Sequence, residues 1–95
     1  MTFPSYAMFW WADGDIRAAG RDELSAGHVV FVATTPAPLV EHIPVDDLGR
    51  IVLDRRTLHL ERAGLPTIHV GSLDGPGALR ELHDRLVEAA HPVAA

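Results

Sequence analysis

The sequence predicts an α+β protein that is mostly β: a small antiparallel barrel or curled sheet of about six strands, with one amphipathic helix at the C-terminus. Three observations lead to this fold class. The chain has 95 residues, which allows a single domain over 1–95. From 16 to 71, short β-branched and alternating apolar runs are separated by turn residues. Towards the C-terminus the spacing of apolar residues lengthens to three or four, which is typical of a helix.

The first twelve residues form an aromatic segment. Five of the six aromatic residues of the chain lie in it: Phe3, Tyr6, Phe9, Trp10 and Trp11. Side chains of an extended segment alternate, so three consecutive aromatics cannot all face one interior. Two interpretations follow. The segment is the first strand of the barrel, with Trp10 or Trp11 inside, or it is an interface in which Tyr6, Phe9, Trp10 and Trp11 contact a partner.

The residues from 16 to 71 divide into antiparallel strands. They are predicted at 16–24, 28–35, 40–45, 50–53, 57–61 and 67–71. The prolines at 36, 38 and 44 restrict the third of these to an edge strand or an extended link. In the first strand the alternation places Ile16 and Leu24 on the core face together with Asp22. A lone buried carboxylate is costly, so we expect Asp22 to pair with an arginine or with backbone N–H groups.

A hairpin and a helix complete the inventory. The sequence is symmetrical about Gly64, which pairs Leu58 with Val70 and Leu60 with Ile68 on one face, and His59 with His69 on the other. The helix is predicted over 76–90, with one apolar face and a charged face opposite. Asp74 or Ser72 would cap its start.

The order of these patterns resembles the bacterial pleckstrin-homology-like and GRAM-type domains. The segment GRDELSAGHVVFVATT is similar to their G-x-L-x-L-turn-L-x-F hairpin, and HIPVDDLGRIVL is similar to the I-P-hydrophobic-x-x-I segment that follows. RRTLHLERAGLPTIHV and ALRELHDRLVEA continue in matching order, so the resemblance spans 16–90. It implies a pleckstrin-homology-like fold. Lipid-binding members carry basic residues around the first hairpin loop, whereas Ser25-Ala26-Gly27 is flanked here by Glu23 and His28, so no functional residue transfers.

The charge balance and the apolar runs exclude several partners. Eight arginines, no lysine and 13 acidic residues give a net charge of -5, with no basic patch for nucleic acid. The longest apolar run, 7–12, is too short for a membrane span, and no secretory signal is visible, so we expect a cytoplasmic protein. The absence of Cys excludes thiolate zinc sites and cysteine nucleophiles. The lack of Lys, Asn and Gln is typical of a GC-rich bacterial genome.

Histidines are the remaining candidates for chemistry. His59 and His69, as cross-strand neighbours, are weak candidates for sharing a metal ion. The sequence has no HExxH and no HxH spacing to support them, so we expect no metal site and no cofactor. No arrangement of a nucleophile with a base is visible either, so an enzyme is the less favoured interpretation and no catalytic residue is assigned.

These observations favour a non-enzymatic protein-interaction module. We expect it to associate with a second copy of itself, or else with another protein, through the aromatic segment. The alternative is a small-ligand or metal-binding carrier or sensor on the same barrel, which would show convergent polar groups in a pocket.

Overall fold

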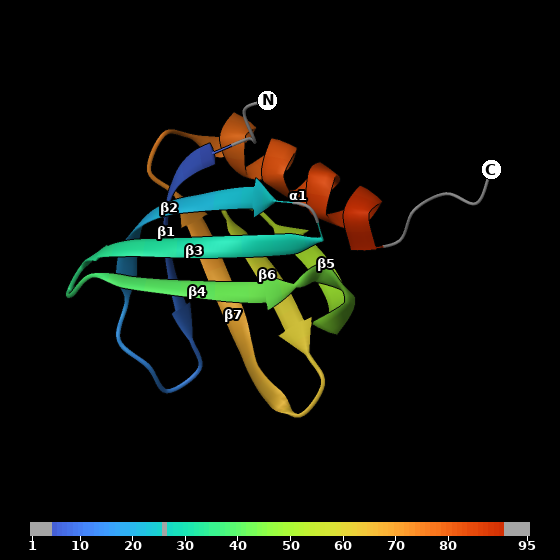
Figure 1. The fold of residues 1–95 in the computed structure, drawn as a ribbon. Coiled ribbons are helices and arrows are strands. Elements are labelled where there is room, and N and C mark those ends of the chain that lie inside the picture. Colours follow the sequence, from blue (N-terminus) through green and yellow to red (C-terminus); the bar gives the residue numbers. More distant parts are fainter. Residues whose placement is uncertain (1–4, 26, 91–95) are drawn as a thin grey trace.

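Seven antiparallel strands form one curled sheet, and a single long helix lies over one end of it (Figure 1). The computed structural model describes residues 5–25 and 27–90. The strands are β1 (Ser5–Ala12), β2 (Ala18–Ser25), β3 (His28–Thr35), β4 (Leu39–Pro44), β5 (Leu48–Asp54), β6 (Thr57–Arg62) and β7 (Leu65–Ser72). A 3-10 turn, η1 (Val45–Asp47), precedes β5, and the helix α1 spans Pro76–Ala90.

The order of the strands in the sheet is β4-β3-β2-β1-β7-β6-β5. Strands β4 and β5 are the two edges, so the sheet is not closed into a barrel. The fold is therefore mostly β with one C-terminal helix, as expected, but the expected number of about six strands was wrong. The seventh strand is β1, which forms the middle of the sheet between β2 and β7. Of the aromatic segment 1–12, Phe3 lies outside the described residues.

The hairpin of β6 and β7 has the predicted register. Leu58 lies opposite Val70, His59 opposite His69, and Leu60 opposite Ile68. The four apolar members are buried and the two histidines are half-buried on the other face. The chain turns at Gly64, whose φ of 72° is one that glycine adopts without strain.

Strand β2 begins later than its alternation predicts. The connection from β1 runs from Asp13 to Arg17, and Ile16 within it is 80 % exposed rather than directed into the core. Asp22 does face inwards and is fully buried, as predicted. Its carboxylate has no hydrogen-bond partner among residues 5–25 and 27–90, so the expected pairing was wrong.

The core lies between the concave inner face of the sheet and α1. Figure 1 shows β2, β3 and β4 crossing in front of β7, β6 and β5, with the helix along one end. The helix places three leucines in this core, Leu79, Leu82 and Leu86. Their spacing of three and four keeps all three on one face of the helix. Burying these side chains stabilises the packing of the helix on the sheet. Within the two described ranges, no helix has the length and apolar character needed to cross a membrane.

Candidate functional site

The four residues of the expected interface divide between the two faces of β1. Tyr6 and Trp10 point into the core and each is only 7 % exposed. Phe9 and Trp11 are half-buried on the outer face. This division follows from strand alternation, which sends every second side chain to the opposite face. Trp10 packs on Phe31 of β3 with ring centroids 5.0 Å apart, so its burial belongs to the core.

The outer aromatic pair is covered by an arginine from the neighbouring turn. The rings of Phe9 and Trp11 lie nearly parallel, with centroids 6.0 Å apart. The guanidinium of Arg17 lies 4.5 Å from the Trp11 ring centroid and 5.4 Å from that of Phe9. A cation above an aromatic face is attracted by the ring quadrupole. Arg17 therefore takes part of the surface that an interface through these rings would use.

Phe9 also fills a gap in the neighbouring strand. It lies opposite Gly71 of β7, and a Cβ on Gly71 would overlap the Phe9 ring. A strand glycine often marks the close approach of another group, and here that group is an aromatic ring. Both the ring and the glycine thus belong to the packing of the outer face.

A row of imidazoles continues this surface from β1 across β7 to β6. Trp11 contacts His69, with ring centroids 5.2 Å apart, and the Nδ1 atoms of His69 and His59 lie 2.7 Å apart. On its other side the Nε2 atom of His69 lies 2.6 Å from Oδ1 of Asp13. The two weak metal candidates are therefore adjacent, as the mirror symmetry predicts. Asp13 is a member of this cluster that sequence reasoning assigned only to a turn.

A surface hollow of about 340 Å³ adjoins the imidazoles. Its walls are side chains of β5, β6, β7 and the β1–β2 turn: Asp13, Arg50, Val52, His59, Glu61, Thr67 and His69. In the part of the chain that the structure describes, no three His, Cys, Asp or Glu side chains are grouped so that they could hold a metal ion together.

An apolar cavity opens at the end of the sheet formed by the β1–β2 and β3–β4 connections. It has a volume of about 430 Å³, and Trp10 and Trp11 both line it. Exposed apolar side chains surround it, with Ile16 at 80 % and Leu39 at 59 % exposure. Sequence reasoning missed this region because it placed Ile16 in a strand. Asp13-Gly14-Asp15 does mark the turn, but the connection continues for two more residues, through Ile16 and Arg17, before β2 begins.

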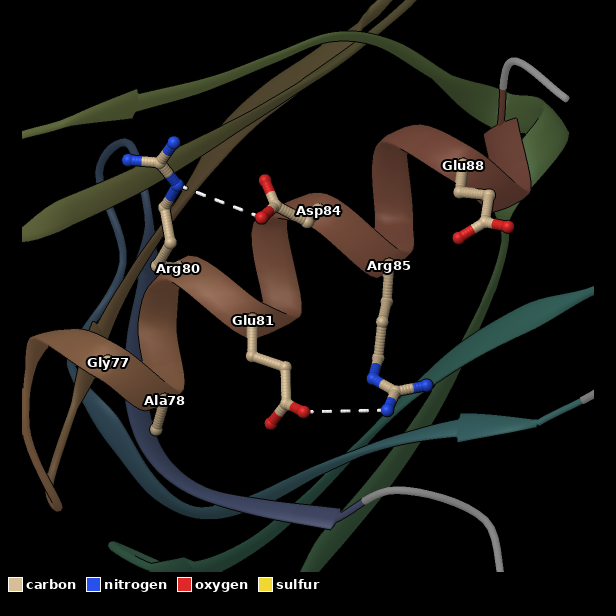
Figure 2. Close-up of a pocket in the computed structure, with 7 residues that line it drawn as sticks. All are labelled: Gly77, Ala78, Arg80, Glu81, Asp84, Arg85 and Glu88. Atoms are coloured by element: carbon tan, nitrogen blue, oxygen red, sulfur yellow. Dashed lines mark hydrogen bonds and ion pairs between the residues drawn. The ribbon is translucent and has the colours of Figure 1, made fainter. Parts of the chain in front are cut away.

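The exposed side of α1 carries paired charges over an open hollow of about 750 Å³ (Figure 2). Arg80 lies 3.7 Å from Asp84, and Arg85 lies 3.4 Å from Glu81, each pair one helical turn apart. Exposed pairs of this kind contribute little to stability and are typical of a solvated helix face. We therefore assign no site to this surface.

Comparison with known proteins gives a structural match but no function. No protein-family model matches the chain, and no curated protein matches it. Among solved structures, it is similar to the C-terminal domain of an unknown protein from Leishmania infantum, with 16 % sequence identity and a TM-score of 0.71. That match covers 90 % of this chain and 84 % of the other. At this identity the likeness establishes the fold alone.

Proposed function

We propose that this chain is a non-enzymatic protein-interaction module on a pleckstrin-homology-like scaffold, and that its partner is a second copy of the same chain. The scaffold part of the proposal is supported by the order of the elements, in which seven antiparallel strands precede one C-terminal helix. It is also supported by the resemblance of the segments between 16 and 90 to the pleckstrin-homology-like pattern.

The observation that carries the interaction is a protruding apolar side chain beside an apolar cavity. Ile16 is 80 % exposed and helps to line the 430 Å³ cavity that Trp10 and Trp11 also line. Covering an apolar side chain removes it from water, which is favourable by about 1.5–3 kcal/mol for a residue of this size. A partner that both fills the cavity and covers Ile16 would therefore bind favourably to this surface.

A second copy meets both requirements at once. Across a two-fold axis, each protomer presents the same surface, so Ile16 of one copy can enter the cavity of its partner while the partner's Ile16 enters the first. The surface is self-complementary in this sense, because the projecting Ile16 and the cavity that receives it lie side by side. The rim is not uniformly charged, since Asp15 and Glu41 are accompanied by Arg62.

The interface so proposed uses part of the aromatic segment. Trp11 remains in it because it lines the cavity, and Phe9 lies next to it beneath Arg17. Tyr6 and Trp10 contribute to the core that supports the interface, because their burial leaves little surface for a partner.

Sedimentation equilibrium of a matched pair of variants tests this proposal. Ile16→Asp places a charge at the proposed interface, in an exposed turn where the fold tolerates it. Leu73→Asp is the control, because Leu73 is 56 % exposed in the connection between β7 and α1, at the end of the sheet where α1 begins. We expect wild type and Leu73→Asp to sediment with twice the mass of the chain, and Ile16→Asp with the mass of a single chain. A wild type that stays monomeric at high micromolar concentration would contradict the proposal.

A carrier of small apolar ligands is the second candidate, because the same cavity is lined mainly by apolar side chains. The two candidates differ in what fills it. A carrier would take up a free apolar molecule, and the emission of Trp10 and Trp11 would shift on its addition while the protein sedimented as a monomer.

A further inference from the structure

Two histidine side chains on the outer face of the β6–β7 hairpin face each other with their Nδ1 atoms. His59 and His69 are direct cross-strand partners, and their Nδ1 atoms lie 2.7 Å apart. At that separation one nitrogen donates a proton and the other accepts it. One of the two Nδ1 atoms therefore carries a lone pair that faces its neighbour.

Asp13 determines which nitrogen of His69 carries the proton. Its Oδ1 lies 2.6 Å from Nε2 of His69, and a carboxylate accepts hydrogen bonds, so Nε2 of His69 is the donor. In neutral His69 the lone pair is then on Nδ1, and His59 donates its Nδ1 proton to it. A histidine that binds a metal is held in this way, with its second ring nitrogen donating to a carboxylate that fixes the ring.

We propose that His59 and His69 bind a divalent transition-metal ion such as Zn²⁺ through their two Nδ1 atoms, with Asp13 orienting His69. Imidazole nitrogen is a preferred donor for Zn²⁺, Ni²⁺ and Cu²⁺, whereas Mg²⁺ and Ca²⁺ take oxygen ligands. On binding, the metal takes the place of the Nδ1 proton of neutral His59 and one proton is taken up at Nε2 from water, so His59 stays neutral and no net proton is released.

The rearrangement that this requires is small. Two imidazole nitrogens at about 2.0–2.1 Å from a tetrahedral Zn²⁺ are roughly 3.3 Å apart. The two rings therefore separate by roughly half an ångström from their hydrogen-bonded position, and each turns so that its Nδ1 atom points at the metal rather than at the other ring. Both are half-buried side chains on well-paired strands, so the backbone already holds them in register.

The remaining coordination positions are filled by water. No third ligating side chain of the described residues is placed to complete the site, and the hollow of about 340 Å³ beside the imidazoles leaves room for solvent. A site with two protein ligands and exchangeable water binds more weakly than a structural zinc site, which has four protein ligands. The proposal is independent of the proposed interaction of two copies, and either can fail without the other.

Isothermal titration of ZnCl₂ into tag-free protein tests the site. We expect one Zn²⁺ per chain for the wild type and no binding at this position in His59→Ala. Asp13→Asn should weaken binding by about tenfold or more, the usual effect of removing a carboxylate that orients a metal-binding histidine. His83→Ala is the matched control, because the Nδ1 atom of His83 also lies close to a carboxylate oxygen, at 2.8 Å from Asp84, but its ring belongs to α1 rather than to the β6–β7 hairpin.

The location is checked independently by ring ¹⁵N shifts. Binding should move the Nδ1 resonances of His59 and His69 and leave that of His83 in place. If His59→Ala does not melt cooperatively, the affinity of Asp13→Asn for Zn²⁺ is the test of the site. The Asp13 side chain is 65 % exposed, so its replacement leaves the core untouched. Absence of heat with wild type at high micromolar concentration, or an affinity that neither variant changes, overturns the proposal.

Discussion

Tyr6 and Asp22 lie directly opposite each other on β1 and β2, both directed into the core, and the Asp22 carboxyl has no hydrogen-bond partner within the described part of the chain. Asp22 is fully buried, and burial raises the pKa of its carboxyl to about 8. Burial also raises the pKa of the Tyr6 hydroxyl, with a further contribution from Glu81 of α1. A buried carboxyl without a partner is stable only in its neutral form, so the fold holds Asp22 protonated at neutral pH and below.

The first prediction concerns the pH dependence of stability. The unfolded carboxyl has a pKa near 3.8 and the folded one about 8, so between these values the folded state binds one proton more. The free energy of unfolding should therefore fall as the pH rises from about 4 to 8, at up to about 1.4 kcal/mol for each pH unit. Urea unfolding of wild type and Asp22→Asn at pH 5 and pH 8.5 measures this change in the free energy of unfolding.

Asp22→Asn has nearly the same shape as the native side chain and does not ionise. We expect its free energy of unfolding to exceed that of wild type at pH 8.5, and the difference to shrink or reverse at pH 5. Asp22→Leu should likewise be neutral or stabilising near neutral pH, by about 1 kcal/mol, because the buried carboxyl is replaced by an apolar group. Parallel pH profiles for wild type and Asp22→Asn would show that Asp22 is ionised and paired in solution.

The second prediction concerns Gly71. A methyl group there would overlap the Phe9 ring, so Gly71→Ala should lower the free energy of unfolding by about 1–3 kcal/mol, as overpacking does elsewhere. Chemical denaturation of Gly71→Ala, Phe9→Ala and the double variant measures this. The cost should be smaller in the Phe9→Ala background, where the ring is absent.

Gly77 provides a control for the general effect of replacing glycine by alanine. It lies in the first turn of α1, and a Cβ there would meet open space among the described residues, so Gly77→Ala should stabilise by about 0.5–1 kcal/mol. An equal cost of Gly71→Ala with and without the Phe9 ring would contradict the packing described for the outer face.

The third prediction concerns Arg17 above the two outer aromatic rings. Arg17→Ala should destabilise by about 0.5–1 kcal/mol, the usual contribution of an exposed cation to an aromatic face. Because the contact is with Trp11, Arg17→Ala should also change the tryptophan emission. In a Trp11→Leu background the destabilisation should be reduced, and a double-mutant cycle with no coupling between the two positions would show that the stacking contributes nothing.

Much of the fold could be predicted from sequence period. The helix and the β6–β7 hairpin follow from spacings of three to four and of two, because each element buries only one face. Strand β1 was harder to assign. It is apolar on both faces because one faces the core and the other is covered by Arg17, and the covering group belongs to a turn whose path the sequence does not specify.

The candidate sites depended on contacts that spacing alone does not reveal. The pairing of His59 with His69 could be predicted, since it follows from the hairpin register, but Asp13 reaches His69 only because β1 lies beside β7. The rim position of Ile16 depends on where the β1–β2 turn ends. The predicted strand begins at 16, two residues before β2 begins at Ala18, so the alternation directed Ile16 into the core, whereas the structure has it exposed.

The most direct test of the proposed self-association is an isotope-filtered NOE experiment. A mixture of ¹³C-labelled and unlabelled protein reports only contacts between different copies. We expect intermolecular NOEs from the Ile16 methyl groups to the indole protons of Trp11 of the partner subunit, and none from the methyl groups of Leu73. A dimeric sample in which Ile16 shows no intermolecular NOE would place the interface elsewhere and contradict the proposed two-fold contact.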